Sequence, residues 1–332
     1  GQAILSASDA PLEYAFGDFV FFRRHVPQYV MHFGPISTRA DHANAIEECL
    51  QEVALALPQV EVLSLKSVPI GSVLHNSIER SDSLIRRHFF ILPWGNESLY
   101  CRIRWNGRVE TYLQSIGKET RKNLARYSKK LFADASIRAS VRRFEPEQAE
   151  EFLREFAPLI EKTWQRKQSI VTLNPAAELR IRFAARKRSF LGYILYVNHS
   201  PVAYRYCFIC GKTAVMFQTG YDPSWASYRV SNVLFLEVLK DFERHAVPVT
   251  SLDFLPHITP FKLHTTNDQR PSRNYYMFRR NISGMVNFAT LALTDRISRL
   301  GGALAKYVYQ YVGPARDRRA ILKQNPPSKH SD

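Results

Sequence analysis

The sequence predicts an α/β (or α+β) protein of more than one domain. Runs in which apolar and polar residues alternate predict strands, and other runs place apolar residues three or four positions apart, as amphipathic helices do. The two kinds of run are interleaved along the chain. With 332 residues, 45% of them apolar and 12% aromatic, the chain has enough material for a packed core, which excludes a disordered protein.

The first hundred residues show both kinds of run. Aromatic and apolar residues alternate before Pro27 and again before Gly34-Pro35, and an amphipathic run ends at Pro58. The segment therefore reads as α/β. Its predicted elements are strands over 19–22, 29–33, 60–65, 87–92 and 99–103 and helices over 41–57 and 71–80.

A basic amphipathic helix follows from Leu113. Its apolar positions step by three or four as far as Leu131, and cations occupy the other faces. Such a helix either connects two domains with its charges in water or holds an anionic substrate or membrane surface, and both interpretations stay open. The cations are Lys118, Arg121, Lys122, Arg126, Lys129 and Lys130.

Two further helices lead into a three-stranded meander. Pro146 suits the first position of a helix that we expect to kink at Pro158, and Asn174-Pro175 starts another that runs to about 188. Short turn-forming connections then separate three strands over 190–197, 202–209 and 213–221.

The remaining elements alternate between helix and strand. The run 231–244 is apolar around most of its circumference and predicts a helix buried against a sheet. We expect strands over 249–254 and 274–279, an irregular stretch over 255–272, a terminal helix or helix pair over 284–312 and a basic, disordered tail over 314–332.

The charge lies mainly in the latter part of the chain. Lys and Arg number 46 against 30 Asp and Glu, a net charge of +16, yet residues 1–100 carry −4 and residues 101–332 carry +20. This asymmetry predicts an anionic partner for the latter part, although a high pI also serves solubility alone. No DNA-reading motif accompanies the charge, so duplex DNA is not the expected partner.

Several classes of protein have no support in the sequence. No apolar run reaches the ~18 residues of a membrane-spanning helix, and no secretion signal is visible in the first thirty residues. Four cysteines are too few for a disulfide framework, so we expect a reducing, cytoplasmic location. Phosphate-loop, dinucleotide-binding, paired-His metalloprotease and Gly-x-Ser-x-Gly motifs are missing, which leaves kinases, dehydrogenases and serine hydrolases without local support.

Cys207 and Cys210 have the spacing of a metal or redox pair but lie in a predicted strand. Residues three apart in a strand point to opposite faces, and the sequence offers no second ligand pair. We therefore predict that both are core residues and that the protein holds no metal.

The most informative segment is 218–237, which runs from a strand through a loop into the long apolar helix. Unpaired N–H groups and the positive end of the helix dipole favour a phosphate or pyrophosphate at such a start. Arg229 adds a cation there, and Ser231 and Asn232 add capping groups. An ordinary capped helix behind a meander is the alternative.

This segment resembles the CelD/BcsL-type (BioF2-like) acetyltransferases of the GNAT superfamily, which are related to the Fem-type aminoacyltransferases. The similarity covers most of 20–280. It implies mixed sheets flanked by helices, arranged as two GNAT-like halves. The residues that carry it are Tyr221-Asp222-Pro223, Tyr228, Val233-Leu234, Glu237, Asp253-Phe254 and Phe261-Lys262, with Lys118, Arg121, Lys122 and Asn123 in the preceding helix, Pro93-Trp94 and Leu113 before it, and Glu61 to Leu65 with Val68-Pro69 in the front half.

The chain departs from that family's pattern at two places. Val230-Ser231 stands where the family usually has Pro-Gly, and residues 255–260 lack the Gly that usually lies between the strand-end Asp and the Lys. Losing these glycines puts tight CoA binding in doubt. The front half also lacks the family's first strand pair.

The resemblance implies direct attack of an amine or hydroxyl on a thioester donor, acetyl-CoA, another acyl-CoA or an acyl carrier protein. A saccharide or envelope-related amine or hydroxyl is the implied acceptor. The implied roles are donor binding for Phe217, Gln218, Thr219, Arg229, Val230, Ser231 and Asn232, acceptor binding for Lys262, Tyr221 and Tyr228, and catalysis as base for Asp253 and His257, with His264 in reserve. Each of Asp253, His257 and Lys262 has a plainer interpretation, as a turn cap, a loop residue and a solvated cation.

The resemblance also suggests how the chain is divided and what it contacts. We expect an N-terminal half over 1–110, a helical connection over 111–188, an acyltransferase core over 189–283 and a helix with a basic tail over 284–332. The apolar stripe and cations of 284–323 allow contact with a membrane surface, although a helix packed on its own protein shows the same stripe. A Fem-like enzyme using charged tRNA and a non-catalytic binding module are the alternative functions.

Overall fold

The computed structural model describes residues 5–8, 11–16, 19–31, 43–80, 82–83, 85–163, 175–255, 258–298 and 300. Its strands are β1 (Leu5–Ser8), β2 (Leu12–Phe16), β3 (Phe19–Arg24), β4 (Gln28–Met31), β5 (Val62–Pro69), β6 (Phe89–Arg104), β7 (Ala139–Phe144), β8 (Phe190–Val197), β9 (Ser200–Cys210), β10 (Thr213–Tyr221), β11 (Ser251–Asp253) and β12 (Asp268–Arg279).

The helices lie between these strands. They are α1 (Ala43–Ala56), α2 (Val73–Glu79), α3 (Ile85–His88), α4 (Val109–Ser115), α5 (Lys118–Phe132), α6 (Ala149–Lys162), α8 (Pro175–Arg186), α9 (Val230–Arg244) and α10 (Pro260–Thr265), with 3₁₀ turns η1 (Pro146–Gln148) and η2 (Pro223–Tyr228). Residues 282–298 form a further helix, which we call the C-terminal helix.

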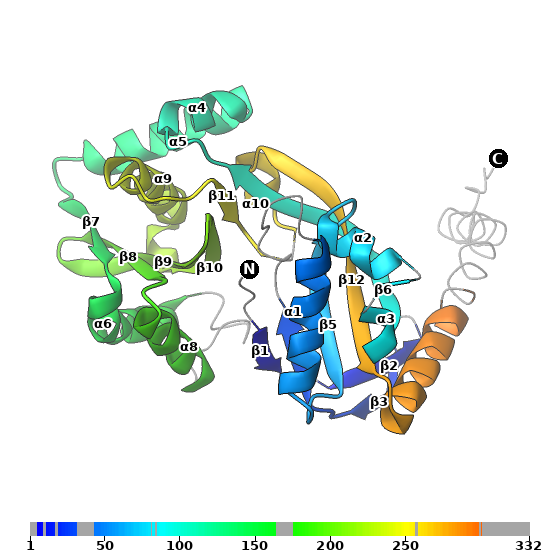
Figure 1. The fold of residues 1–332 in the computed structure, drawn as a ribbon. Coiled ribbons are helices and arrows are strands. Elements are labelled where there is room, and N and C mark those ends of the chain that lie inside the picture. Colours follow the sequence, from blue (N-terminus) through cyan, green and yellow to red (C-terminus); the bar gives the residue numbers. More distant parts are fainter. Residues whose placement is uncertain are drawn as a thin grey trace, which may run out of the picture.

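One mixed sheet runs through the molecule in the order β1-β4-β5-β12-β6-β11-β10-β9-β8-β7, and β2 and β3 form a separate hairpin. The pairs β4–β5 and β10–β11 are parallel, and their connections contain α1 and α9 respectively. The long strands β6 and β12 pair along most of their length and join the two halves of the sheet (Figure 1). The expected fold class, mixed β structure flanked by helices, is confirmed.

Both faces of the sheet are covered in each half (Figure 1). In the C-terminal half, α4, α5 and α9 cover one face, and α6 and α8 cover the other. In the N-terminal half, α1, α2 and α3 cover one face, and the β2–β3 hairpin and the C-terminal helix cover the other. Each half therefore has its own cores, which is how a chain of this length buries its apolar residues.

The meander and α9 form as predicted because their sequences have clear periods. Along β9, Tyr204, Tyr206 and Phe208 pack toward α6, while Ala203 and Cys207 pack toward α9. Cys207 and Cys210 are buried on opposite faces, which confirms that they are core residues. Within the described residues, no group of three or more His, Cys, Asp and Glu side chains is placed to hold a metal ion.

Four local expectations are wrong. The two strands expected over 87–92 and 99–103 are one strand, β6, which accommodates Gly95 at φ +72° and a register shift opposite β12. The basic helix is two helices, because Gly117 is the N-cap of α5. Residues 139–144, expected within a helical connection, form the edge strand β7. The stretch 255–272, expected to be irregular, contains α10, capped by Thr259, and the start of β12.

The division into four segments stays a prediction, although β12 pairs with β5 of the front half. Of the terminal helix expected over 284–312, the part up to 298 is helical and the part beyond 300 lies outside the described residues, as does the tail. None of the described helices has the length and apolar character to cross a bilayer.

Candidate active site

The parallel strands β10 and β11 part from each other after a short pairing. They pair only over Thr213–Val215 and Ser251–Asp253, and β10 then continues to Tyr221 while β11 ends. On its other side β10 stays paired with β9 to its end. The pairing of β11 with β10 therefore ends at Val215, and β10 runs on beyond the end of β11.

Phe217, Gln218 and Thr219, the residues of β10 predicted to bind the acyl donor, do not all lie on the same face of the sheet. A register shift opposite β9 lies between Met216 and Gln218. The Gln218 amide Nε2 donates to the hydroxyl of Tyr204 at 2.9 Å, and its Oε1 accepts from Tyr206 at 2.7 Å. Phe217 stacks on Tyr206 on the same face. Thr219 lies on the face toward α9, with its hydroxyl 3.4 Å from that of Ser231.

The start of α9 is built on a left-handed residue. Arg229 has φ 50° and ψ 43°, and its carbonyl accepts from the N–H groups of Asn232 and Val233. Val230 is fully buried, so this predicted donor residue is part of the core, while Ser231 and Asn232 are half-buried. The first N–H groups of α9 have no carbonyl within the helix to bond, which leaves them for a cap or a ligand.

The two tyrosines predicted to bind the acceptor both pack against the core that contains α9. The hydroxyl of Tyr228 donates to Asp134 at 3.0 Å, and the ammonium of Lys130 lies 4.4 Å from its ring centre. Tyr221 packs at the edge of the core beneath α9. These contacts tie η2 to the end of α5.

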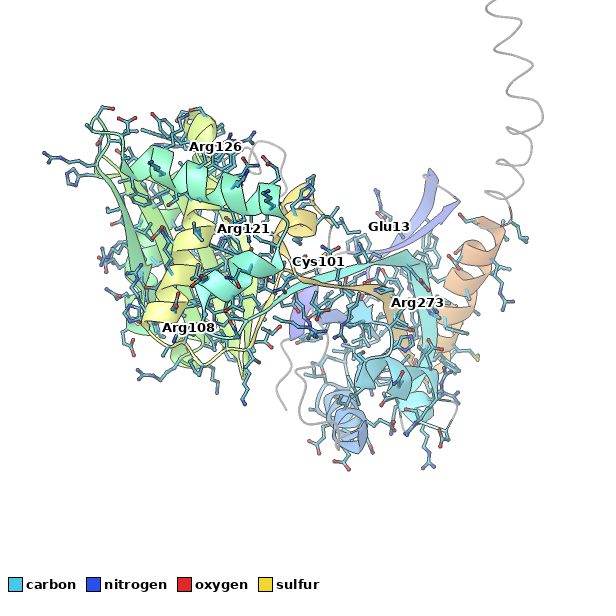
Figure 2. All side chains as sticks on the ribbon, turned by 90° about the horizontal axis from the view of Figure 1, so that it is seen from above. Glu13, Cys101, Arg108, Arg121, Arg126 and Arg273 are labelled. Atoms are coloured by element: carbon cyan, nitrogen blue, oxygen red, sulfur yellow. The ribbon has the colours of Figure 1, made fainter. Side chains whose placement is uncertain are left out.

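A pocket of about 290 Å³ opens between α5, the start of α9 and α10. It brings together Arg229, Asn232 and the reserve residue His264, which the sequence places far from α5. Its lining includes the cation Arg229 and no carboxylate. The pocket is lined by Thr120, Asn123, Leu124, Tyr127, Arg229, Asn232, Pro260, Phe261, His264 and Thr265. Figure 2 shows Arg121 and Arg126 on α5.

A buried guanidinium lies behind the floor of this pocket. Arg205 of β9 is only 3% exposed, and its Nε and Nη2 have no hydrogen-bond partner among the described residues. Its guanidinium carbon is 5.3 Å from the ring centre of Phe235 and 5.7 Å from that of Phe261, which lines the pocket. Burial lowers the pKa of Arg205 to about 10.

The predicted base Asp253 lies at the end of β11 and is 2% exposed. Its Oδ2 accepts from the hydroxyl of Tyr100 at 2.5 Å, and its Oδ1 accepts from the N–H of Leu255 at 2.8 Å. Burial raises the pKa of Asp253, while these hydrogen bonds counteract the rise. Leu255 is left-handed at φ 62°, in the stretch where the resembling family usually has a glycine.

Lys262 lies beside this carboxylate. Its ammonium donates to the carbonyl oxygen of Leu255 at 3.0 Å, and burial lowers its pKa to about 8. Cys101, labelled in Figure 2, lies near Lys262 and has its pKa raised by burial. The structure thus places Asp253 and Lys262 in one cluster with Tyr100. His257, the second predicted base, lies outside the described residues.

The chain resembles known acyltransferases in the segment that builds this site. Residues 118–263 match the family model Acetyltransf_6, an acetyltransferase (GNAT) domain. This segment resembles a GNAT domain. It contains α5, the meander, α9, β11 and the first residues of α10.

The similarity to solved structures extends beyond this segment. FemX superposes with a TM-score of 0.52 at 8% identity, over 77% of this chain and 81% of FemX. The C-terminal domain of a putative lysylphosphatidylglycerol synthetase from Agrobacterium fabrum has a TM-score of 0.48 at 11% identity, over 81% of each chain. L-PGS from Bacillus licheniformis has a TM-score of 0.46 at 14% identity, over 82% of this chain and 83% of that chain. No curated protein matches the sequence.

Sequence reasoning did not find Tyr100 or Arg205. Tyr100 reaches Asp253 only because β6 lies beside β11, and the two residues are 153 positions apart. Arg205 does carry a signal, since an arginine inside an otherwise apolar strand is rare unless it is paired or used.

Proposed function

We propose that this protein transfers an acyl group from acyl-CoA or an acyl carrier protein to an amine or hydroxyl of a saccharide or other envelope-related acceptor, as the CelD/BcsL-type acetyltransferases do. The observation that carries the proposal is the opening between β10 and β11, with the start of α9 at its mouth, inside the GNAT domain.

The residues present fit an extended thioester donor that ends in phosphates. Beyond Val215, where the pairing with β11 has ended, the backbone of Gln218 and Gly220 offers partners to amide groups, and the start of α9 with Arg229 favours phosphate oxygens. The missing glycines do not prevent the donor from approaching the backbone. The side chain of Val230 is buried in the core, and Arg229 and Leu255 adopt left-handed backbone conformations without being glycine. The donor supplies the electrophilic thioester carbon.

The protein's part in the chemistry falls to Lys262 and Asp253. An amine with a pKa of about 8 is neutral in a useful fraction near neutral pH, so Lys262 can accept the proton of the attacking amine or hydroxyl. Asp253 is held by Tyr100 and Leu255 and stabilises the lysine once it is protonated. In this proposal Asp253 is a positioning residue, and His257 remains a candidate second base.

Calorimetry with acetyl-CoA and longer acyl-CoAs tests the donor site. We expect binding that Arg229→Asn weakens about tenfold, because a cation beside a phosphate contributes roughly 1–2 kcal/mol. Asn is chosen because it tolerates the left-handed conformation. Arg244→Asn, at the other end of α9, removes an exposed arginine of the same helix and is the matched control. Failure of the wild type to bind any acyl-CoA or acyl carrier protein contradicts the proposal.

A second candidate function uses charged tRNA as donor. The cations Arg126, Lys129 and Lys130 of α5 line an open groove of about 440 Å³, and the FemX fold extends over most of the chain. Filter binding of tRNA across a salt series distinguishes this function, since phosphate contacts give a steep loss of affinity with salt. A flat response excludes it. If neither donor binds, a non-catalytic binding module is the remaining function.

A further inference from the structure

The C-terminal helix carries apolar residues on its exposed side as well as on its buried side. Its buried side carries Gly284, Asn287, Leu291 and Thr294. Its exposed side carries the large aliphatic residues, with Ile282 79% and Leu293 59% exposed. The further exposed aliphatic side chains of this helix and of the position after it are Met285, Val286, Ile297 and Leu300. In an ordinary surface helix the side that faces water is polar.

Polar contacts fix this orientation. Asn287 Oδ1 accepts from Arg24 at 2.8 Å and from the hydroxyl of Tyr14 at 3.3 Å, and its Nδ2 donates to Glu61 at 3.2 Å. A Cβ at Gly284 would lie 1.9 Å from the carbonyl oxygen of Arg279, so only glycine permits this approach. The helix cannot rotate to bury its aliphatic side without breaking these contacts, and the exposure is therefore a property of the fold.

Three arginines lie beside the start of the same helix. Arg86, Arg87 and Arg280 line an open groove of about 460 Å³ together with Asp82 and Ser83. Arg280 stacks over the ring of Phe90 at 4.7 Å, and that ring stacks on Phe288 of the C-terminal helix at 5.5 Å. The groove is thus joined to the helix by direct ring contacts. Arg86 and Arg87 belong to the first hundred residues, which are acidic overall, and Arg280 directly follows β12.

We propose that the C-terminal helix is a membrane-binding face that lies on an anionic lipid surface. Its aliphatic side enters the boundary between headgroups and acyl chains, and Arg86, Arg87 and Arg280 bind lipid phosphates. Charge complementarity selects this occupant, because an exposed apolar stripe on a helix that begins beside three arginines matches the apolar and anionic layers of such a surface. The sequence beyond residue 300 adds six basic and two acidic residues, which strengthens the same attraction.

This face lies at the edge of the front half, remote from the opening between β10 and β11 (Figure 1). The inference therefore does not depend on acyl transfer, and the two proposals can fail separately.

Flotation of the full chain with vesicles tests the inference. We expect it to float with vesicles of phosphatidylglycerol and phosphatidylcholine, and much less with phosphatidylcholine alone. The double variant Leu293→Ser/Ile297→Ser removes two exposed side chains and lowers the partition coefficient by about tenfold or more. Arg87→Gln weakens binding to the anionic vesicles only, and added salt does the same.

The matched control removes comparable exposed apolar side chains from the other half. Leu179 and Phe183 of α8 are 64% and 60% exposed, and Leu179→Ser/Phe183→Ser leaves vesicle binding unchanged. Circular dichroism confirms that each variant is folded.

Any one of four results overturns the inference. The full chain does not float with anionic vesicles, or the two double variants lose binding equally. Alternatively, analytical ultracentrifugation shows a dimer that Leu293→Ser/Ile297→Ser dissociates while vesicles are not bound, in which case a second copy covers the face. Finally, a chain ending at residue 300 floats while the full chain does not, in which case the protein's own terminal segment covers it.

Discussion

Replacing Arg205 by Met should make the protein more stable. The pKa of this guanidinium falls from its usual 12.5 to about 10 because the group is buried. That difference corresponds to a cost of about 3 kcal/mol for keeping the charge in the folded state, since one pKa unit is about 1.4 kcal/mol. The cost is present at every pH below about 10, because the unfolded chain holds the proton more tightly than the folded chain does. A methionine at this position would contact the rings of Phe235 and Phe261, and a thioether packs well against aromatic rings.

We expect Arg205→Met to raise the free energy of unfolding by about 1–3 kcal/mol, as measured by urea denaturation with an unchanged m-value. Arg143→Met is the matched control, because Arg143 also lies on a strand of the sheet but its Nη1 donates to Asp241 at 2.9 Å. Removing it leaves that buried carboxylate without its cation and should destabilise the protein by about 3 kcal/mol. A loss of stability in Arg205→Met would refute the reasoning, since it would mean that the guanidinium has a compensating partner. If an anionic ligand group approaches Arg205 through the pocket floor, the same variant becomes more stable and binds that ligand less well.

Two further predictions concern titrating groups. Because Lys262 acts as a base only when neutral, transfer activity should rise with pH through about 8, and Lys262→Arg should lower it by about a hundredfold or more across the whole range; a profile that is flat around pH 8 would count against this role. Burial alone would raise the pKa of Asp268, but hydrogen bonds from Arg104, Arg102 and Arg270 lower it to about 2. At pH values above its ordinary pKa this carboxylate therefore contributes about 2 kcal/mol to the free energy of unfolding, and the contribution is lost as the pH falls toward 2. Melting curves of Asp268→Asn should depend less on pH in that acid range than those of the wild type.

Elements with a strong local period could be predicted from the sequence. The alternation along the meander and the apolar circumference of α9 depend on neighbours in the chain, and both were placed within a few residues. The edge strand β7 was missed because it exposes much of its surface and carries Arg142 and Arg143, so it lacks the apolar pattern of a central strand. The helix α10 was missed although Thr259 and Pro260 are a recognisable start signal.

The site shows the same contrast. The start of α9 was located because a strand, a loop and a helix follow one another directly. The cluster around Asp253 was not, because Tyr100, Asp253 and Lys262 come from β6, β11 and α10, and no local pattern reports which strands lie side by side. The tie between Tyr228 and α5 has the same origin, since Asp134 lies 94 positions away.

The shared pair β6 and β12 has a mechanical consequence. These strands carry hydrogen bonds of both halves in one ladder, from Asp268 opposite Arg102 to Arg279 opposite Phe89. Rotation of one half relative to the other would break the hydrogen bonds of this ladder. The hinge closure that is common in two-domain enzymes is therefore not expected to admit substrates here. A conformational change on ligand binding should therefore involve a small element packed on β6 and β12. The helix α10 is such an element, since it carries Lys262 and follows the left-handed Leu255.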